Sequence, residues 1–218
     1  MDRSPTLPPY SLGEEIAHAI THGVGIVLSI AGLAVLVGFA SKWGETWHVI
    51  GCSIFGATLI FAYTASTLYH SIPLAGAKGI LRNLDHSAIF LLIAGTYTPF
   101  TLVNLRGPWG WSILGVVWGL AIVGITIEFT PLRKVRAVPI ALYLILGWLI
   151  VIAIKPMIAN VAPGGLALVI AGGLVYTAGM IFYGLRRMPY HHAIWHVFVL
   201  VGSTLHFFAV LFYVIPVQ

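Results

Sequence analysis

Long apolar runs separated by short polar segments occupy most of the chain, and this pattern predicts transmembrane helices. Seven runs approach the roughly 20 apolar residues that a helix needs to cross a bilayer. They cover residues 21–40, 49–69, 87–103, 109–127, 138–154, 166–185 and 193–214. Because short loops join them, consecutive helices should be antiparallel and pack as one bundle. The pattern predicts an all-α membrane protein, a seven-transmembrane helix bundle, in which Gly115-x-x-x-Gly119 would permit close helix contact.

The first 20 residues differ from the rest and are treated as a separate N-terminal polar segment that ends in the start of a helix. Ser11 and Glu14 have the spacing of a capping box, which places a helix start there. Residues 14–22 are amphipathic, as expected of a helix at the membrane surface. The following apolar run is too long for a signal peptide, so no cleavable signal is expected. Residues 21–218 form the predicted transmembrane domain.

Composition and charge support a multi-pass protein of the cell (inner or plasma) membrane. Hydrophobic residues make up 59% of the chain and charged residues 8%, against about 25% charged residues in soluble domains. With a cytoplasmic N-terminus, eight Lys and Arg residues face the cytoplasm and three face outside. This bias predicts a cytoplasmic N-terminus and an outside C-terminus. The basic clusters fit orientation and anionic lipid headgroups better than nucleic acid.

Ionisable residues gather at helix ends that should share the cytoplasmic level of the membrane. His192 and His196 are four residues apart at the start of the last run, so they lie on one helix face. His70 ends the second run, with Ser66 one turn deeper on the same face. Asp85 precedes the third run, which starts from the same side. Antiparallel connectivity requires this shared level, although it does not require the helices to touch.

Three imidazoles and a carboxylate suit zinc. A metal with three histidine ligands keeps a fourth position for water, which is typical of catalytic zinc, and zinc lowers the pKa of such a water towards about 7. Asp85 would then hydrogen-bond that water or act as its general base, and Ser66 would donate a hydrogen bond to a developing oxyanion. Chemistry at this depth indicates a lipid-like substrate.

Structural interpretations compete with these assignments. A single intramembrane histidine is more often a hydrogen-bond partner between helices than a ligand, and a small hydroxyl such as that of Ser66 commonly bridges helices. Structural roles are expected for the other polar residues. A second metal is conceivable at Glu15, His18 and His22, but the polar face of a surface helix is favoured; His86, His191 and His206 are expected to be packing residues, and Glu128 an interfacial charge.

Four segments carry a family resemblance that spans nearly the whole chain. They are EEIAHAITHG at 14–23, STLYH at 66–70, LDHSAIFLLIAGTYTPF at 84–100 and HAIWH at 192–196. With these segments the chain resembles the bacterial hemolysin III family, which is related to the progestin and adipoQ receptors (PAQR) and the alkaline ceramidases. The resemblance implies a seven-helix bundle with a cytoplasmic N-terminus and an intramembrane zinc. It also implies that His70, His192 and His196 are the zinc ligands, that Asp85 holds a zinc-bound water, and that Ser66 lies beside it.

The eukaryotic relatives resemble lipid amide hydrolases, so the leading expectation is a zinc-dependent hydrolase of a lipid amide or ester, ceramidase-like in type. Two alternatives stay open. One is a non-enzymatic membrane-homeostasis or receptor-like protein with a structural zinc, and the other is a pore-forming, cytolytic protein. A membrane lipid or lipid-like substrate is the expected partner.

Overall fold

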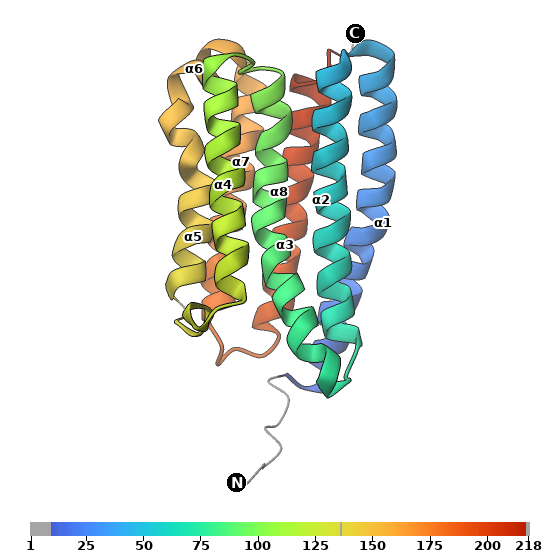
Figure 1. Ribbon diagram of the computed structural model, residues 1–218. Coiled ribbons are helices and arrows are strands. Elements are labelled where there is room, and N and C mark those ends of the chain that lie inside the picture. Colours follow the sequence, from blue (N-terminus) through green and yellow to red (C-terminus); the bar gives the residue numbers. More distant parts are fainter. Residues whose placement is uncertain (1–9, 136, 217–218) are drawn as a thin grey trace, which may run out of the picture.

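The computed structural model describes residues 10–135 and 137–216, and these residues are helical apart from short connections (Figure 1). In chain order the elements are α1 (Leu12–Trp43), α2 (Thr46–Ser71), α3 (Ala75–Leu102), α4 (Pro108–Glu128), η1 (Pro131–Lys134), α5 (Ala137–Trp148), η2 (Leu149–Ala153), α6 (Ile154–Asn160), α7 (Pro163–Gly184) and α8 (His191–Tyr213). The prediction of an all-α membrane protein is confirmed. The capping box is present as predicted, because Ser11 and Glu14 bond each other's backbone N–H groups at the start of α1. Helix α1 continues unbroken past residue 20.

Six segments of the described chain are long and apolar enough to cross a membrane, which makes this a multi-pass membrane protein. They are α1, α2, α4, Ala137–Asn160, α7 and α8. The remaining long helix, α3, is more polar and half of its residues are buried. It packs against α2 and α4 and also contacts α5 and α8, so its polar groups face protein rather than lipid. A seventh crossing by α3 stays a prediction.

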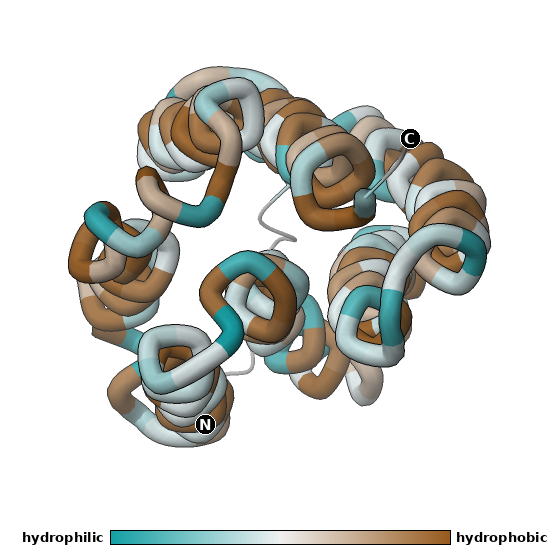
Figure 2. Tube along the Cα trace, turned by 90° about the horizontal axis from the view of Figure 1, so that it is seen from above, coloured by the Kyte–Doolittle hydropathy of each residue, from teal (hydrophilic) through white to brown (hydrophobic). Residues whose placement is uncertain are grey.

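Consecutive helices pack as neighbours, and the circle closes where α1 meets α8. Figure 2 looks along the helices and shows them side by side around the axis of the bundle. The first helix starts and the last helix ends at opposite ends of the bundle (Figure 1). This agrees with an odd number of crossings. The first and last helices of the chain therefore both border the same interior.

Glycines allow α2 and α3 to approach closely. A Cβ atom on Gly95 of α3 would lie 2.0 Å from Thr58 Oγ1 of α2, and one on Gly51 would lie 2.9 Å from Pro99 Cα. Contacts this short leave no room for a methyl group. The expected helix contact at Gly115 and Gly119 is wrong, because a Cβ atom on either glycine would meet nothing within 4 Å.

The fifth apolar run is not one regular helix. Pro156 lacks an N–H group and its ring clashes with the carbonyl four residues earlier, and the chain in that region, Leu149–Ala153, is a 3-10 helix. Tyr97 of α3 forms hydrogen bonds with the backbone on both sides of the change from α5 to η2. Its hydroxyl group donates to the Leu146 and Gly147 carbonyls and accepts from Ile150 N–H. An irregular backbone at membrane depth needs such internal partners.

Candidate metal centre and its cavity

Three histidines from two helices meet inside one end of the bundle. His70 lies in the last turn of α2, and His192 and His196 lie in the first turns of α8. All three are buried, and one ring nitrogen of each lies within 4.8 Å of the others. Zinc–nitrogen bonds are about 2.0–2.1 Å long, so small side-chain movements would close this set around one ion. The three predicted ligands are therefore brought together.

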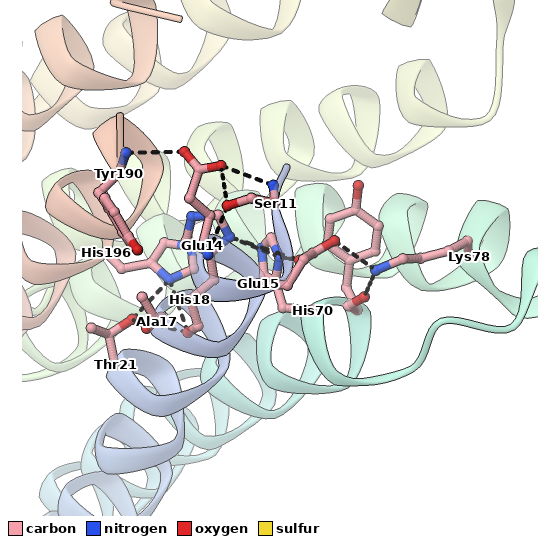
Figure 3. Close-up of polar contacts among 11 residues, drawn as sticks. Ser11, Glu14, Glu15, Ala17, His18, Thr21, His70, Lys78, Tyr190 and His196 are labelled. Carbon is pink, nitrogen blue, oxygen red and sulfur yellow. Dashed lines mark hydrogen bonds and ion pairs between the residues drawn. The ribbon is translucent and has the colours of Figure 1, made fainter. Parts of the chain in front are cut away.

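A carboxylate on α1 orients the His70 ring. Glu15 Oε2 lies 2.5 Å from His70 Nδ1, and Lys78 Nζ lies 3.2 Å from Glu15 Oε1 (Figure 3). With Nδ1–H donated to the carboxylate, the other nitrogen, Nε2, keeps its lone pair. Among the described residues no hydrogen bond reaches this buried Nε2. A histidine that ligates a metal usually has such an outer carboxylate, which fixes its tautomer and raises its basicity.

His196 is oriented in the same way by polar groups of α1. Its Nδ1 lies 3.2 Å from Thr21 Oγ1 and 3.3 Å from the His18 carbonyl oxygen. A carbonyl only accepts, so Nδ1 carries the proton and Nε2 is left with a lone pair. His192 Nδ1 is buried and has no hydrogen-bond partner in the described chain. Buried nitrogens without partners are costly, and a shared cation would satisfy them. The donor set fits a metal.

The two histidines of α1, His18 and His22, belong to the same cluster as the trio. This corrects the expectation that they lie on the polar face of a surface helix. His18 and His22 are buried. The His22 ring stacks on that of His196, with centroids 3.5 Å apart, and His18 Nδ1 lies 3.3 Å from His70 Nδ1. The opposite side of α1 is apolar and exposed. In a membrane protein the polar face of a helix turns towards the interior and the apolar face meets lipid, the reverse of a soluble surface helix.

Asp85 and Ser66 lie on the wall of a cavity beside the histidines. Both are buried, and they line a cavity of about 130 Å³ together with His192 and His196. Asp85 is not a member of either group of possible metal ligands in the described chain, which are the histidine trio and the set Glu15, His18 and His70. It borders the cavity next to the trio.

The rest of the cavity is apolar and aromatic. It lies among α2, α3, α5, α7 and α8, with His22 of α1 also on its wall, and along α8 the wall runs from His192 to His206. Leucine, isoleucine and valine side chains share this wall with Tyr97, Trp148 and Trp195. Ligand cavities in proteins have this composition, mostly apolar with a few polar groups at defined places.

Comparison with known proteins shows the family of this chain. The family described as haemolysin-III related matches residues 10–207. The chain belongs to this family. It is 48% identical over 203 residues to Hemolysin-3 of Bacillus cereus, covering 93% of each chain. It is 46% identical over 208 residues to the Hemolysin-3 homolog of Bacillus subtilis (strain 168), covering 95% of this chain and 98% of that one.

A more distant similarity connects this haemolysin-III-related chain to a PAQR-type protein. The human monocyte to macrophage differentiation factor is 28% identical over 205 residues, covering 90% of this chain and 83% of that one.

Two further residues of this haemolysin-III-related protein differ from expectation. Glu128 ends α4 as expected of a helix-end charge, but it is fully buried, and its Oε2 lies 3.5 Å from His86 Nδ1. His86 borders the cavity next to Asp85. For His191 the structure agrees with the expected packing role, because this residue is buried and its Nδ1 lies 3.1 Å from the Phe182 carbonyl oxygen. The pattern of apolar runs gave no signal for the Glu128–His86 contact.

Tyr10, just before the start of α1, lies over the histidine cluster. The Tyr10 ring stacks on that of His192, with centroids 5.4 Å apart, and meets the edge of His18 at 4.7 Å. Glu14 Oε1 accepts a hydrogen bond of 3.0 Å from Tyr190 N–H, which joins the start of α1 to the start of α8. Burial raises the pKa of Tyr10, so its hydroxyl is neutral at physiological pH. Sequence analysis missed Tyr10, which lies outside every apolar run.

Proposed function

We propose that this protein is a zinc-dependent hydrolase of a lipid amide or ester. The observation that carries the proposal is that two members of the histidine trio, His192 and His196, line an apolar cavity whose wall also includes Asp85 and Ser66. His70, His192 and His196 would hold the ion. Bound there, zinc supplies a Lewis acid that polarises a carbonyl and acidifies water.

The side chains around the trio would take complementary parts in hydrolysis. The Asp85 carboxylate accepts a proton from the attacking water and passes it to the leaving nitrogen or oxygen as the bond to the carbonyl carbon breaks. The Ser66 hydroxyl donates a hydrogen bond to the carbonyl oxygen, where negative charge develops. The trio lies among helix ends at one membrane level, and the apolar cavity leads deeper into the bundle. A substrate with a polar head and a long apolar chain fits that division.

The proposal is tested with purified, zinc-loaded protein and labelled ceramides and acyl amides. We expect hydrolysis that falls by about 10²–10⁴-fold in Asp85→Ala, the usual contribution of a general base. Glu45→Gln is the matched control, because Glu45 is a carboxylate at the far end of α1 and α2 and should leave the rate unchanged. Zinc content is measured in each variant. Turnover that persists in Asp85→Ala would contradict the assigned role.

A structural zinc is the alternative that the geometry also supports. The trio comes from α2 and α8, and the groups that orient it come from α1, so an ion would join three helices. This alternative predicts a zinc-loaded protein that hydrolyses no lipid and loses thermal stability when zinc is removed. Absence of turnover on every lipid offered would favour it over the hydrolase.

A lytic activity is a further alternative, favoured by the name Hemolysin-3 of the Bacillus cereus relative. A pore predicts discrete conductance steps when the purified protein is added to planar bilayers. No conductance in that measurement would remove this alternative.

We also propose seven crossings, with α3 as the seventh, and a cytoplasmic N-terminus. The bias of basic residues supports this orientation. The start of α1 and the end of α8 lie at opposite ends of the bundle (Figure 1), which supports an odd number of crossings. A C-terminal alkaline phosphatase fusion, which is active only outside the cytoplasm, should be active. An inactive fusion at a normal protein level would reverse the orientation.

A further inference from the structure

The end of the cavity remote from the histidine trio contains polar side chains that the hydrolysis does not use. His206 is ten residues beyond His196 on α8, about 15 Å at 1.5 Å per residue. It lines the main cavity and also an adjoining one of about 60 Å³. Trp148 and Tyr97 line both cavities as well. The question is which of these polar groups is available to a ligand.

Two of the three are engaged by the protein itself. Trp148 Nε1 donates to Thr177 Oγ1 at 3.0 Å, and Thr177 donates to a carbonyl of its own helix. The Tyr97 hydroxyl donates to the Gly147 carbonyl at 2.8 Å and accepts from Ile150 N–H at 3.0 Å. Their hydrogen-bonding capacity is largely used in holding α5, η2 and α7 together.

His206 keeps one nitrogen unused. Its Nδ1 lies 2.8 Å from the Gly202 carbonyl oxygen, so Nδ1 carries the proton. Among the hydrogen bonds of the described residues none is made by Nε2 of this ring. The ring is only 6% exposed and is held from two sides: a Cβ atom on Gly172 would lie 2.3 Å from its Cε1, and the Tyr176 ring stacks on it at 5.5 Å. A fixed acceptor therefore borders the cavity.

A charged imidazolium is expensive at this depth in a membrane, so the ring is neutral and Nε2 accepts. A purely hydrocarbon chain in the cavity would leave this acceptor unpaired, at a cost in affinity. We propose that the cavity binds a single-chain lipid with a hydroxyl group about 15 Å from the group held at the trio, and that this hydroxyl donates to His206 Nε2. The inference rests on the proposed function in placing a lipid in the cavity, but its test measures binding and not turnover.

The probes are long-chain ketones, which present a carbonyl but have no leaving group, with a hydroxyl at successive positions along the chain. Each competes with a fluorescent fatty acid for the protein in nanodiscs. One positional isomer should bind about fivefold more tightly than the unsubstituted ketone, the effect of one neutral hydrogen bond. Isomers with the hydroxyl nearer the carbonyl should show no gain.

Two variants separate the nitrogens of His206. His206→Asn keeps a polar group close to the backbone, where Nδ1 is, and should lose the gain. His206→Gln reaches the position of Nε2 with a carbonyl oxygen and should retain part of it. Thermal unfolding shows that both variants are folded before their affinities are compared.

Each outcome decides the question. Equal affinity for all positional isomers, or the same gain in His206→Asn as in the unmodified protein, would overturn the inference. So would failure of every ketone to compete. If ceramides are hydrolysed but the ketones show no hydroxyl preference, the proposed function stands and this inference falls. If the ketones show the preference but no ceramide is hydrolysed, this inference stands and the hydrolase function falls.

Discussion

Glu15 on α1 places Oε2 2.5 Å from Nδ1 of His70 on α2. The carboxylate fixes the tautomer that leaves His70 Nε2 free, and outer partners of this kind contribute about 10–100-fold to metal affinity. Glu15→Gln should therefore lower zinc affinity by about that factor, measured by competition with a chelator. Glu14→Gln is the matched control, because Glu14 caps α1 and bonds Tyr190 but no histidine nitrogen. Equal losses in both variants would contradict the role of Glu15.

Thr21 should have a smaller effect on the same measurement. Thr21→Val removes one of the two acceptors near His196 Nδ1 but leaves the His18 carbonyl in place. We expect a loss of about three- to tenfold in zinc affinity, which corresponds to one hydrogen bond. Thr21→Ser keeps the hydroxyl and should bind zinc normally. A loss in Thr21→Ser as large as in Thr21→Val would indicate a packing effect.

Tyr10 should control how quickly zinc leaves. Its ring covers His192 and His18, so Tyr10→Ala should release zinc to a chelator faster than the unmodified protein, with the same zinc content at equilibrium loading. Tyr10→Phe keeps the ring and should release zinc at the original rate. Stopped-flow measurements with a coloured chelator follow the release. Unchanged release from Tyr10→Ala would show that metal leaves by another route.

The same residue predicts a dependence of stability on alkaline pH. Burial raises the pKa of Tyr10, whereas an unfolded tyrosine titrates near 10. Its contribution to the free energy of unfolding is fully present below pH 10 and declines above it, as the unfolded phenol ionises first. Tyr10→Phe removes this part of the decline. The free energy of unfolding of the two proteins is measured with denaturant in detergent between pH 8 and 11. If it falls equally with pH in both, Tyr10 does not contribute to the decline.

Close packing of α2 on α3 can be tested at Gly95. Gly95→Ala places a methyl group 2.0 Å from Thr58 Oγ1, and overpacking of this kind costs about 1–3 kcal/mol. Gly115→Ala is the control, because its methyl group would meet nothing within 4 Å and alanine favours a helix by about 0.5–1 kcal/mol. Thermal unfolding should rank Gly95→Ala lowest. The opposite ranking would show that α3 shifts at little cost.

Much of this arrangement follows from the sequence because the bilayer constrains it. Helix lengths and alternating directions place His70, Asp85, His192 and His196 at one level, and the structure brings the three histidines together there. The sequence-based prediction was wrong about the direction in which the polar side chains of α1 face. The rule for soluble helices places the stripe that holds His18 on a surface, whereas the structure buries it. The exposed Ile16 and Ile20 on the other face of α1 are the signal that would have turned it inward.

Other features depend on contacts between distant segments, which helix periodicity does not encode. Glu128 is buried because His86 from another helix lies beside it. Tyr10 lies over the histidines because Glu14 bonds Tyr190, 176 residues later in the chain. Such pairings are set by the packing of the finished bundle.

Contact between α1 and α8 also has a consequence for biosynthesis. The first helix is inserted before the last one is translated. His18, His22 and Thr21 are therefore in the membrane before His196 of α8, which they contact in the finished bundle. Polar groups without partners in lipid are costly. This cost favours contact of these side chains with the insertion machinery or with α2 until α8 is inserted. A ribosome that stops before α8 would leave a chain with neither the complete trio nor a closed bundle, which quality-control proteases could recognise.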